Sequence, residues 1–215
     1  MKFSGIVLAG GKSSRMKTDK AGLLLNGKTL LEIQVEKLTT LGCDDVIVSG
    51  KVLPADNILI SSDSQQPVDA DQTATIHPVS DIIPDLGPMG GLYSCFPECN
   101  HSCAIVMSVD VPLLSKETLQ QLLNAHFDKN PDATILSYCG RPEPLIGVYN
   151  TAHSALCKEL IDNKKLAIRA LLERLDCQYY DFHGDPNELQ NCNSPEDYAQ
   201  IKHVLSLDAN IQITG

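Results

Sequence analysis

Short apolar runs rich in β-branched residues recur along the chain, and segments with helical spacing separate them. The runs that predict strands are Ile6–Leu8, Val46–Val48, Ile58–Ile60, Thr75–Val79, Cys103–Val109, Ala133–Ser137 and Ile146–Tyr149. This alternation predicts an α/β fold, a three-layer sandwich in which helices cover a mainly parallel sheet.

Four segments have the pattern of a helix. In the first, Leu31, Val35 and Leu38 recur at i, i+4 and i+7, and the helix is expected to end near Gly42. The others are Ser115–His126 with Ser115 as its N-cap, Ala167–Leu175, and a last helix that begins at Ser194-Pro195, where Asp197 completes a capping box. Gly87–Gly91 is expected to turn into a further helix.

Composition places the chain among ordinary globular proteins, because 43% of its 215 residues are hydrophobic and 20% are charged. No composition break divides it, so one domain over residues 1–215 is expected, with a polar loop at Ser61–Gln72 that could move. No apolar stretch approaches the roughly 20 residues of a membrane helix, and the first apolar run meets glycine too early for a signal peptide. We expect a soluble cytoplasmic protein with no membrane contact.

The charge distribution indicates a small anionic ligand. A net charge of −10 argues against a broad surface for nucleic acid. The first 30 residues are locally basic, however, with Asp19 as the one acid against Lys2, Lys12, Arg15, Lys17, Lys20 and Lys28. A nucleotide would suit this local excess.

The glycine-rich segment that follows Ile6–Leu8 is a candidate phosphate loop. Ala9, Gly10 and Gly11 leave backbone N–H groups uncovered, so that these groups can turn toward phosphate oxygens. Arg15 and Lys20 would add positive charge. The segment is not a P-loop, because the first glycine of that motif would fall on Ile6, and it lacks the G-x-G-x-x-G pattern of dinucleotide folds.

Three motifs in this region resemble a known family. They are L-A-G-G-x-S-x-R-M at Leu8–Met16, D-K at Asp19-Lys20, and L-x-x-x-G-K-x-L-L-E at Leu23–Glu32. Together they resemble the nucleotidyltransferases that activate sugars, isoprenoid precursors and pterins, and most closely the molybdenum cofactor guanylyltransferases. The resemblance continues through Asp81, Gly87–Gly91, Asp110-Val111-Pro112, Pro144–Tyr149 and Asn191–Pro195.

The resemblance implies a Rossmann-like nucleotidyltransferase fold and transfer of GMP from GTP to the molybdopterin cofactor, with pyrophosphate as the second product. The N-terminal part would bind nucleotide and the C-terminal part the acceptor. The nucleotide-binding positions it implies are Leu8, Ala9, Gly10, Gly11, Lys20, Ser49, Asp81 and Asp110. Ser49 departs from the family pattern, in which asparagine is common, so base selectivity stays open at this position.

Asp110 is the candidate metal ligand, because it follows the strongly apolar run Cys103–Val109 at the end where open α/β sheets bind ligands. It would coordinate Mg²⁺, which prefers carboxylate oxygen. The alternative is an aspartate that caps the turn before Pro112. With Arg15 and Lys20, Asp110 would form the catalytic set, since the ionised acceptor phosphate requires no protein base.

The acceptor positions implied by the resemblance are Gly90, Asn191 and Asn193. The two asparagines have a simpler interpretation as turn and cap residues ahead of the last helix. Cys95, Cys99 and Cys103 are spaced too widely for a common zinc motif, and Pro97 interrupts any helix that would align them, so ordinary reduced cysteines are expected.

Three alternatives to guanylyl transfer stay open. The chain could transfer cytidylyl or another nucleotidyl group to the pterin or to a sugar or polyol phosphate. It could also be a nucleotide-binding regulator without turnover, or a carrier that hands the pterin onward. Transient contact with other cofactor-synthesis proteins or with molybdoenzymes would suit the guanylyltransferase and the carrier alike.

Overall fold

A computed structural model describes residues 1–10, 20–50 and 74–213, with side chains as far as residue 206. The predicted strand Ile58–Ile60 and the polar loop Ser61–Gln72 lie outside the described residues. Within them, no helix is long and apolar enough to cross a membrane.

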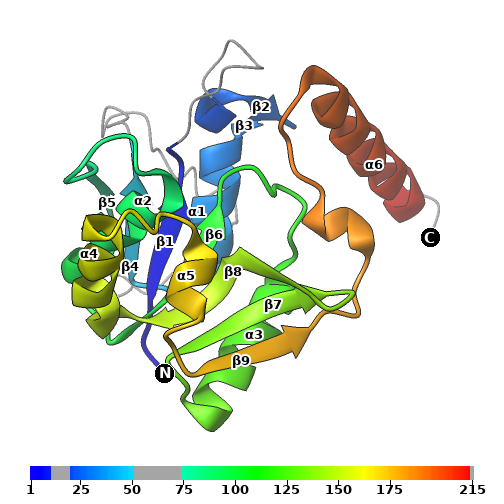
Figure 1. Ribbon diagram of the computed structural model, residues 1–215. Coiled ribbons are helices and arrows are strands. Elements are labelled where there is room, and N and C mark those ends of the chain that lie inside the picture. The colour runs from blue at the N-terminus through cyan, green and yellow to red at the C-terminus, as the bar shows by residue number, and fades with distance from the viewer. Residues whose placement is uncertain (11–19, 51–73, 214–215) are drawn as a thin grey trace.

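Seven of the described strands form one sheet in the order β5-β4-β1-β6-β8-β7-β9 (Figure 1). They are β1 (Ser4–Leu8), β4 (Asp45–Ser49), β5 (Thr75–Val79), β6 (Cys103–Ser108), β7 (Ala133–Tyr138), β8 (Arg141–Asn150) and β9 (Cys177–Asp181). β8 is antiparallel to β6 and β7, and the other pairs are parallel. The mainly parallel sheet is therefore confirmed, with one reversed strand that the sequence pattern did not reveal.

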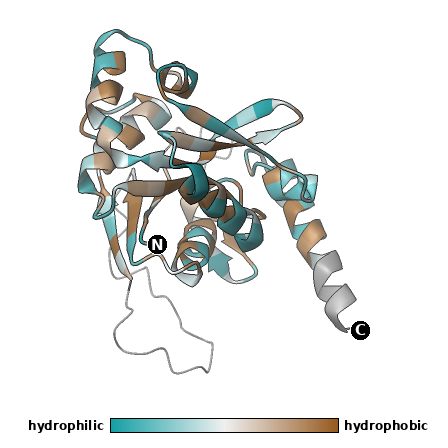
Figure 2. Cartoon of the chain, turned by 90° about the horizontal axis from the view of Figure 1, so that it is seen from below, coloured by the Kyte–Doolittle hydropathy of each residue, from teal (hydrophilic) through white to brown (hydrophobic). Residues whose placement is uncertain are grey.

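Helices cover both faces of this sheet. The hydrophobic cluster on one face includes residues of α1 (Leu30–Thr40), α3 (Lys116–Lys129) and α6 (Pro195–Ile213), and that on the other face includes residues of α2 (Gly87–Cys95), α4 (Ser154–Asp162) and α5 (Ile168–Leu172). Successive residues of β1 alternate between the clusters, since Ile6 and Leu8 belong to one and Val7 to the other. Figure 2 shows apolar colouring along the strands and polar colouring on the outer helix surfaces. The predicted three layers are confirmed.

The smaller elements complete the chain. A two-stranded antiparallel ribbon joins β2 (Leu24–Leu25) to β3 (Lys28–Thr29). The short 3-10 helices are η1 (Lys20–Gly22), η3 (Phe96–Glu98), η4 (Thr151–His153) and η5 (Pro186–Leu189). The ribbon, α4 and β9 were not predicted from the sequence, and the helix predicted at Ala167–Leu175 is shorter, at Ile168–Leu172.

Local capping fixes where the longer helices begin. The Ser115 side chain accepts a hydrogen bond from the Thr118 N–H at the start of α3, as predicted. At the start of α6, Asp197 N–H donates to Ser194 Oγ, while the Asp197 carboxylate accepts from the Ser194 N–H. The predicted capping box is therefore present. It holds in place the chain that enters α6, directly beside the candidate acceptor residues.

Strand order determines where a ligand can bind. From β1 the chain moves outward to β4 and β5, and then returns to the other side of β1 to form β6. This reversal is the topological switch point of an open α/β sheet, and ligands bind there at the carboxyl ends of the strands. The ends of β1 and β6 carry Ala9-Gly10 and Asp110.

Candidate active site

Three hydrogen bonds continue the sheet beyond its strands and join the loops at this edge. The N–H of Ala9 donates to Ser49 O, that of Gly50 to Val79 O, and that of Val109 to Leu8 O, each at 3.1 Å. The first residues after β1, β4 and β6 therefore form one continuous surface. Leu8 itself is buried at the end of β1, whereas Gly10 is exposed on this surface.

The glycine loop begins against a second glycine. Gly50 has φ +112°, and a Cβ built on it would lie 2.9 Å from both Cα and N of Gly10. Real Cβ atoms essentially never approach backbone so closely, so the two chains can meet only because residue 50 has no side chain. Gly50 therefore supports the start of the candidate phosphate loop. Gly11 and Arg15, predicted farther along that loop, lie outside the described residues.

Ser49, Asp81 and Gly91 meet beside Gly50. The Ser49 hydroxyl donates to Oδ1 of Asp81 at 3.5 Å, and a Cβ on Gly91 of α2 would lie 2.8 Å from the same hydroxyl oxygen. Burial raises the pKa of the Asp81 carboxyl, and the Ser49 hydrogen bond opposes this shift. The predicted nucleotide-binding residues Ser49 and Asp81 thus adjoin each other at the end of the sheet.

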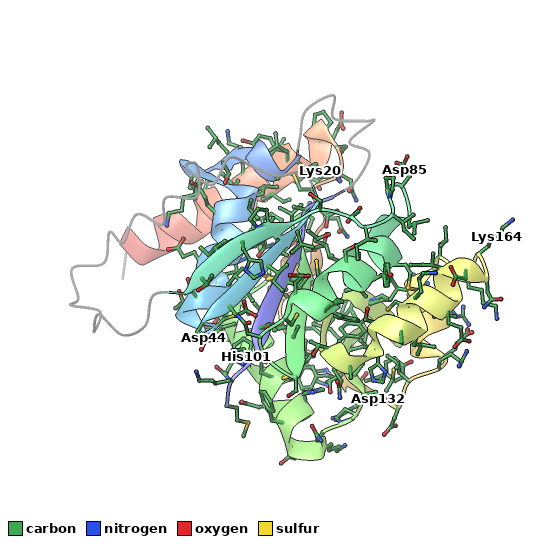
Figure 3. The ribbon with its side chains drawn as sticks, turned by 90° about the vertical axis from the view of Figure 1, so that its left-hand side faces the viewer. Lys20, Asp44, Asp85, His101, Asp132 and Lys164 are labelled. Atoms are coloured by element: carbon green, nitrogen blue, oxygen red, sulfur yellow. The ribbon has the colours of Figure 1, made fainter. Side chains whose placement is uncertain are left out.

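Lys20, Asp110 and Asn193 come together from three distant parts of the chain. Lys20 Nζ lies 3.6 Å from Oδ2 of Asp110 and donates a hydrogen bond to Oδ1 of Asn193. The side chains of Lys20 and Asp110 are each 20% exposed, so the ion pair is only partly screened by water. Figure 3 shows Lys20 at the end of the sheet opposite Asp44 and His101.

The turn that carries Asp110 is bonded to the segment that carries Asn193. The Cys192 N–H donates to the Asp110 carbonyl at 2.7 Å, and the Ser108 hydroxyl donates to Oδ1 of the Asp110 carboxylate. Backbone and side chain of Asp110 are therefore both held. The main-chain N–H of Asn193 bonds to Asp197, so this asparagine also takes part in capping α6, while its side chain faces Lys20.

The other two predicted acceptor residues are Asn191 and Gly90. Asn191 is exposed. Gly90 is buried in α2, where a Cβ would lie 2.9 Å from Cβ of Leu86. The missing side chain of Gly90 thus lets α2 pack against the preceding turn. Contact of either residue with an acceptor stays a prediction.

Oxygen atoms are the metal donors that the site offers. Among the described residues, no group of three or more His, Cys, Asp and Glu side chains could hold a metal ion. Asp110 supplies one carboxylate, and the side-chain oxygen of Asn193 is bonded to the same lysine, Lys20, that pairs with Asp110. Such a sparse oxygen set suits Mg²⁺, which usually takes one or two carboxylates and completes its shell with substrate phosphates and water.

Cys95 is the last residue of α2, Cys99 follows η3, and Cys103 begins β6. The Cys99 thiol donates to the Cys95 carbonyl at 3.4 Å, and burial raises the pKa of Cys95 and of Cys99 to about 12. Thiols with such a pKa stay protonated at neutral pH and are poor metal ligands and nucleophiles.

Sequence reasoning missed two parts of the site. Gly50 follows the predicted strand at Val46–Val48, and a glycine in that place is a signal for close backbone approach. Ser108 ends the apolar run before Asp110, where a hydroxyl two residues from a carboxylate is a weaker signal. Neither pattern by itself identifies the partner, because each partner lies in another strand or turn.

Comparison with known proteins gives a consistent result. Residues 5–178 match the family model described as a MobA-like NTP transferase domain. The chain is 32% identical over 205 residues to the molybdenum cofactor guanylyltransferase of Xanthomonas euvesicatoria pv. vesicatoria, covering 94% of this chain and 95% of that protein. It is 29% identical over 208 residues to a probable molybdenum cofactor guanylyltransferase of Geobacillus sp. (strain WCH70), with 93% and 98% covered.

A solved structure extends the likeness to the fold. The molybdopterin-guanine dinucleotide biosynthesis protein A of Archaeoglobus fulgidus superposes with a TM-score of 0.73 at 22% identity, covering 95% of this chain and 99% of that one. At this identity the superposition speaks for the fold, and it agrees with the switch-point architecture described above.

Proposed function

The chain belongs to the family of MobA-like NTP transferase domains, and from that premise we propose that it transfers GMP from GTP to the molybdopterin cofactor. The products would be molybdopterin guanine dinucleotide and pyrophosphate. Curated relatives that match over more than nine-tenths of both chains carry the name of this activity, which supports the assignment over its alternatives.

The observation that carries the proposal is the meeting of Lys20, Asp110 and Asn193. Lys20 follows the glycine loop, Asp110 lies in the turn after β6, and Asn193 precedes α6. A nucleotide held by the N-terminal part and an acceptor held by the C-terminal part would therefore share one lysine and one carboxylate. A transfer between two bound substrates needs this kind of shared centre.

The reaction requires no dedicated base in the protein. A terminal phosphate oxygen of the pterin cofactor, already ionised near neutral pH, attacks the α-phosphorus of GTP. A new P–O bond forms, the bond to the β-phosphate oxygen breaks, and pyrophosphate leaves with the electron pair. Lys20 would neutralise charge that develops on the phosphates, and the backbone N–H groups near Gly10 would donate hydrogen bonds to phosphate oxygens.

Mg²⁺ is the metal that the site would hold, through Asp110 with the Asn193 oxygen nearby. When bound, the ion supplies further neutralisation of phosphate charge. The Ser108 hydroxyl would keep the Asp110 carboxylate oriented, and Lys20 would balance its charge before substrates arrive.

Ser49 is the residue that leaves the identity of the selected nucleotide base undetermined. It bonds to Asp81 at the expected nucleotide side of the site, and it replaces an asparagine that is common at this position in the resembled family. A change of hydrogen-bonding groups at a base-binding position can change the base selected, because an unpaired polar group in a closed site is costly. Cytidylyl transfer is the competing function that Ser49 leaves open.

The test is to incubate the purified protein with Mg²⁺, molybdopterin cofactor and each of GTP, CTP, ATP and UTP, and to measure pyrophosphate release. Release with GTP is expected. Release with CTP alone would overturn the guanylyl assignment, and release with none would favour a regulator or a pterin carrier. Retained pterin without nucleotide-dependent turnover would identify the carrier.

Two substitutions connect the activity to the site. Asp110→Asn removes one charge with little change of shape, and it is expected to lower turnover by about 10²–10³-fold. Asp162→Asn is the matched control, because Asp162 is an exposed residue of α4 that pairs with Lys158. Equal turnover in the two variants would contradict the role of Asp110.

A further inference from the structure

We propose that Gln34 and Lys37 of α1 are positioning residues for the transfer, because they hold the turn that carries Asp110. The inference rests on the proposed function. Neither residue was singled out by the sequence.

Gln34 bonds to two carbonyls of the turn at once. Its Nε2 donates to Ser108 O at 3.1 Å and to Val111 O at 2.9 Å. The two acceptors lie on either side of Asp110, so one amide group closes the ends of the segment that presents the carboxylate. The Gln34 side chain is fully buried, at 0% exposed, and its bonds are therefore not exchanged for water.

Lys37 determines which way the Gln34 amide faces. Its Nζ donates to Gln34 Oε1 at 3.2 Å and to Pro112 O at 2.6 Å. Because Lys37 Nζ donates this hydrogen bond, the atom of the Gln34 amide that faces it is the oxygen. The NH₂ group is then left to face Ser108 O and Val111 O. Lys37 thus orients Gln34 and also bonds to a third carbonyl of the same turn.

The placement of these polar groups is unusual for the face that carries them. α1 packs against the core through Leu30, Leu31, Val35 and Leu38, all nearly inaccessible. A glutamine in the same row is costly to bury unless its bonds are made. Here the bonds are made to the last residue of β6 and to the turn that follows it, so the glutamine serves this turn.

The remaining anchors of the turn come from other directions. Val109 N–H donates to Leu8 O in β1, and Cys192 N–H donates to Asp110 O. α1 therefore adds side-chain bonds to the turn from a third direction, besides the Ser108 hydroxyl that bonds to the Asp110 carboxylate. Loss of that support would leave the turn attached but free to shift. A displacement of about 1 Å at a catalytic group can cost about 10²-fold in rate.

The main test is Gln34→Leu, which removes the amide bonds while keeping an apolar side chain of similar size. We expect kcat for pyrophosphate release to fall about 10–100-fold while KM for GTP changes less than about threefold. The matched control is Gln120→Leu, because Gln120 is an exposed residue of α3 whose amide bonds only to Asn124. This control is expected to behave as the unmodified chain.

Hydrogen exchange measures the turn without depending on turnover. In Gln34→Leu the amides of residues 108–114 are expected to exchange at least about tenfold faster, while those of β9 keep their rates. If the unmodified chain releases no pyrophosphate with any nucleotide, the proposed function fails, and exchange alone then decides whether Gln34 holds the turn. Folded Gln34→Leu protein with both kcat and exchange within about twofold of the unmodified chain would overturn the proposal.

Lys37 variants provide the test if Gln34→Leu does not fold. Lys37→Met leaves the glutamine in place but removes its orienting donor, and it is expected to show the same faster exchange and lower kcat to a smaller degree. Lys37→Arg keeps donors, and a cavity of about 480 Å³ lined by Lys37, Pro112 and Glu188 leaves room for the larger group. Lys37→Arg should restore most of the loss; equal defects in both variants would contradict a role for donation.

Discussion

Replacing Gly50 with alanine is expected to damage both stability and nucleotide use, since two separate costs meet at this residue. The first is backbone strain, because φ is +112° and an L-residue there costs about 1–2 kcal/mol. The second is a contact: the new Cβ would lie 2.9 Å from Gly10, where ordinary contact begins at 3.4 Å. Gly10 would have to move by roughly 0.5 Å, and such overpacking costs about 1–3 kcal/mol.

Gly42→Ala separates these two costs. Gly42 has φ +85°, but a Cβ there would meet nothing within 4 Å, and the residue lies at the end of α1 away from the site. This variant should lose about 1–2 kcal/mol of unfolding free energy from strain alone, whereas Gly50→Ala should lose about 2–5 kcal/mol. Urea titration of both variants, analysed by linear extrapolation, measures the difference.

Kinetics complete the comparison. Because the displaced Gly10 begins the candidate phosphate loop, KM for GTP should rise about tenfold or more in Gly50→Ala and stay unchanged in Gly42→Ala. The reasoning is refuted if the two variants lose equal stability and have equal KM. That outcome would mean that the close contact between the two glycines is relieved without moving the loop.

Three further expectations concern single side chains. Burial lowers the pKa of Lys37 to about 7, although the charge of Glu188 opposes the shift. From pH 7 to about 10 the unfolded chain therefore binds a proton that the folded chain lacks. In this range the stability of the protein relative to Lys37→Met should rise by up to about 1 kcal/mol per pH unit. A constant difference between the two proteins in urea titrations would exclude this. Gly91→Ala should raise KM for GTP several-fold, because the new Cβ would push on Ser49. Its stability should change little, because the helix preference of alanine over glycine, about 1 kcal/mol, offsets the cost of this contact. An unchanged KM would show that the contact is tolerated. Ser194→Ala should cost about 1 kcal/mol of unfolding free energy by removing the α6 cap, and a loss below the error of urea titration would argue against it.

The local pattern of the sequence was sufficient to predict the bounds of elements that depend on local contacts. β5 has the bounds predicted from its β-branched run, and α3 and α6 begin at the predicted caps, because a cap bonds to residues only a few positions away. The resemblance to a family was confirmed by the match over residues 5–178. It could be recognised from sequence because its glycine and lysine motifs are continuous stretches.

Elements with weak hydrophobic patterns were missed. β9 lies at the sheet edge and is partly exposed, so its residues lack the apolar run of a central strand. β8 was predicted only at Ile146–Tyr149, but it begins at Arg141, after a tight turn in which Cys139 and Gly140 both have positive φ. Cys-Gly is not among the common sequences for such a turn, so the sequence did not reveal that β8 runs antiparallel to β7.

The sequence by itself predicted which residues are candidates to bind phosphate and metal, because Lys20 and Asp110 have their chemistry wherever they lie. Only the tertiary structure decided which residues meet. Asn193 joins Lys20 and Asp110, and Gln34 reaches the carbonyls on both sides of Asp110, because the strand order reverses at β1 and brings distant segments to one edge of the sheet. The physical reason is that side-chain chemistry belongs to a single residue, whereas contacts across strands depend on strand order, which no local pattern encodes.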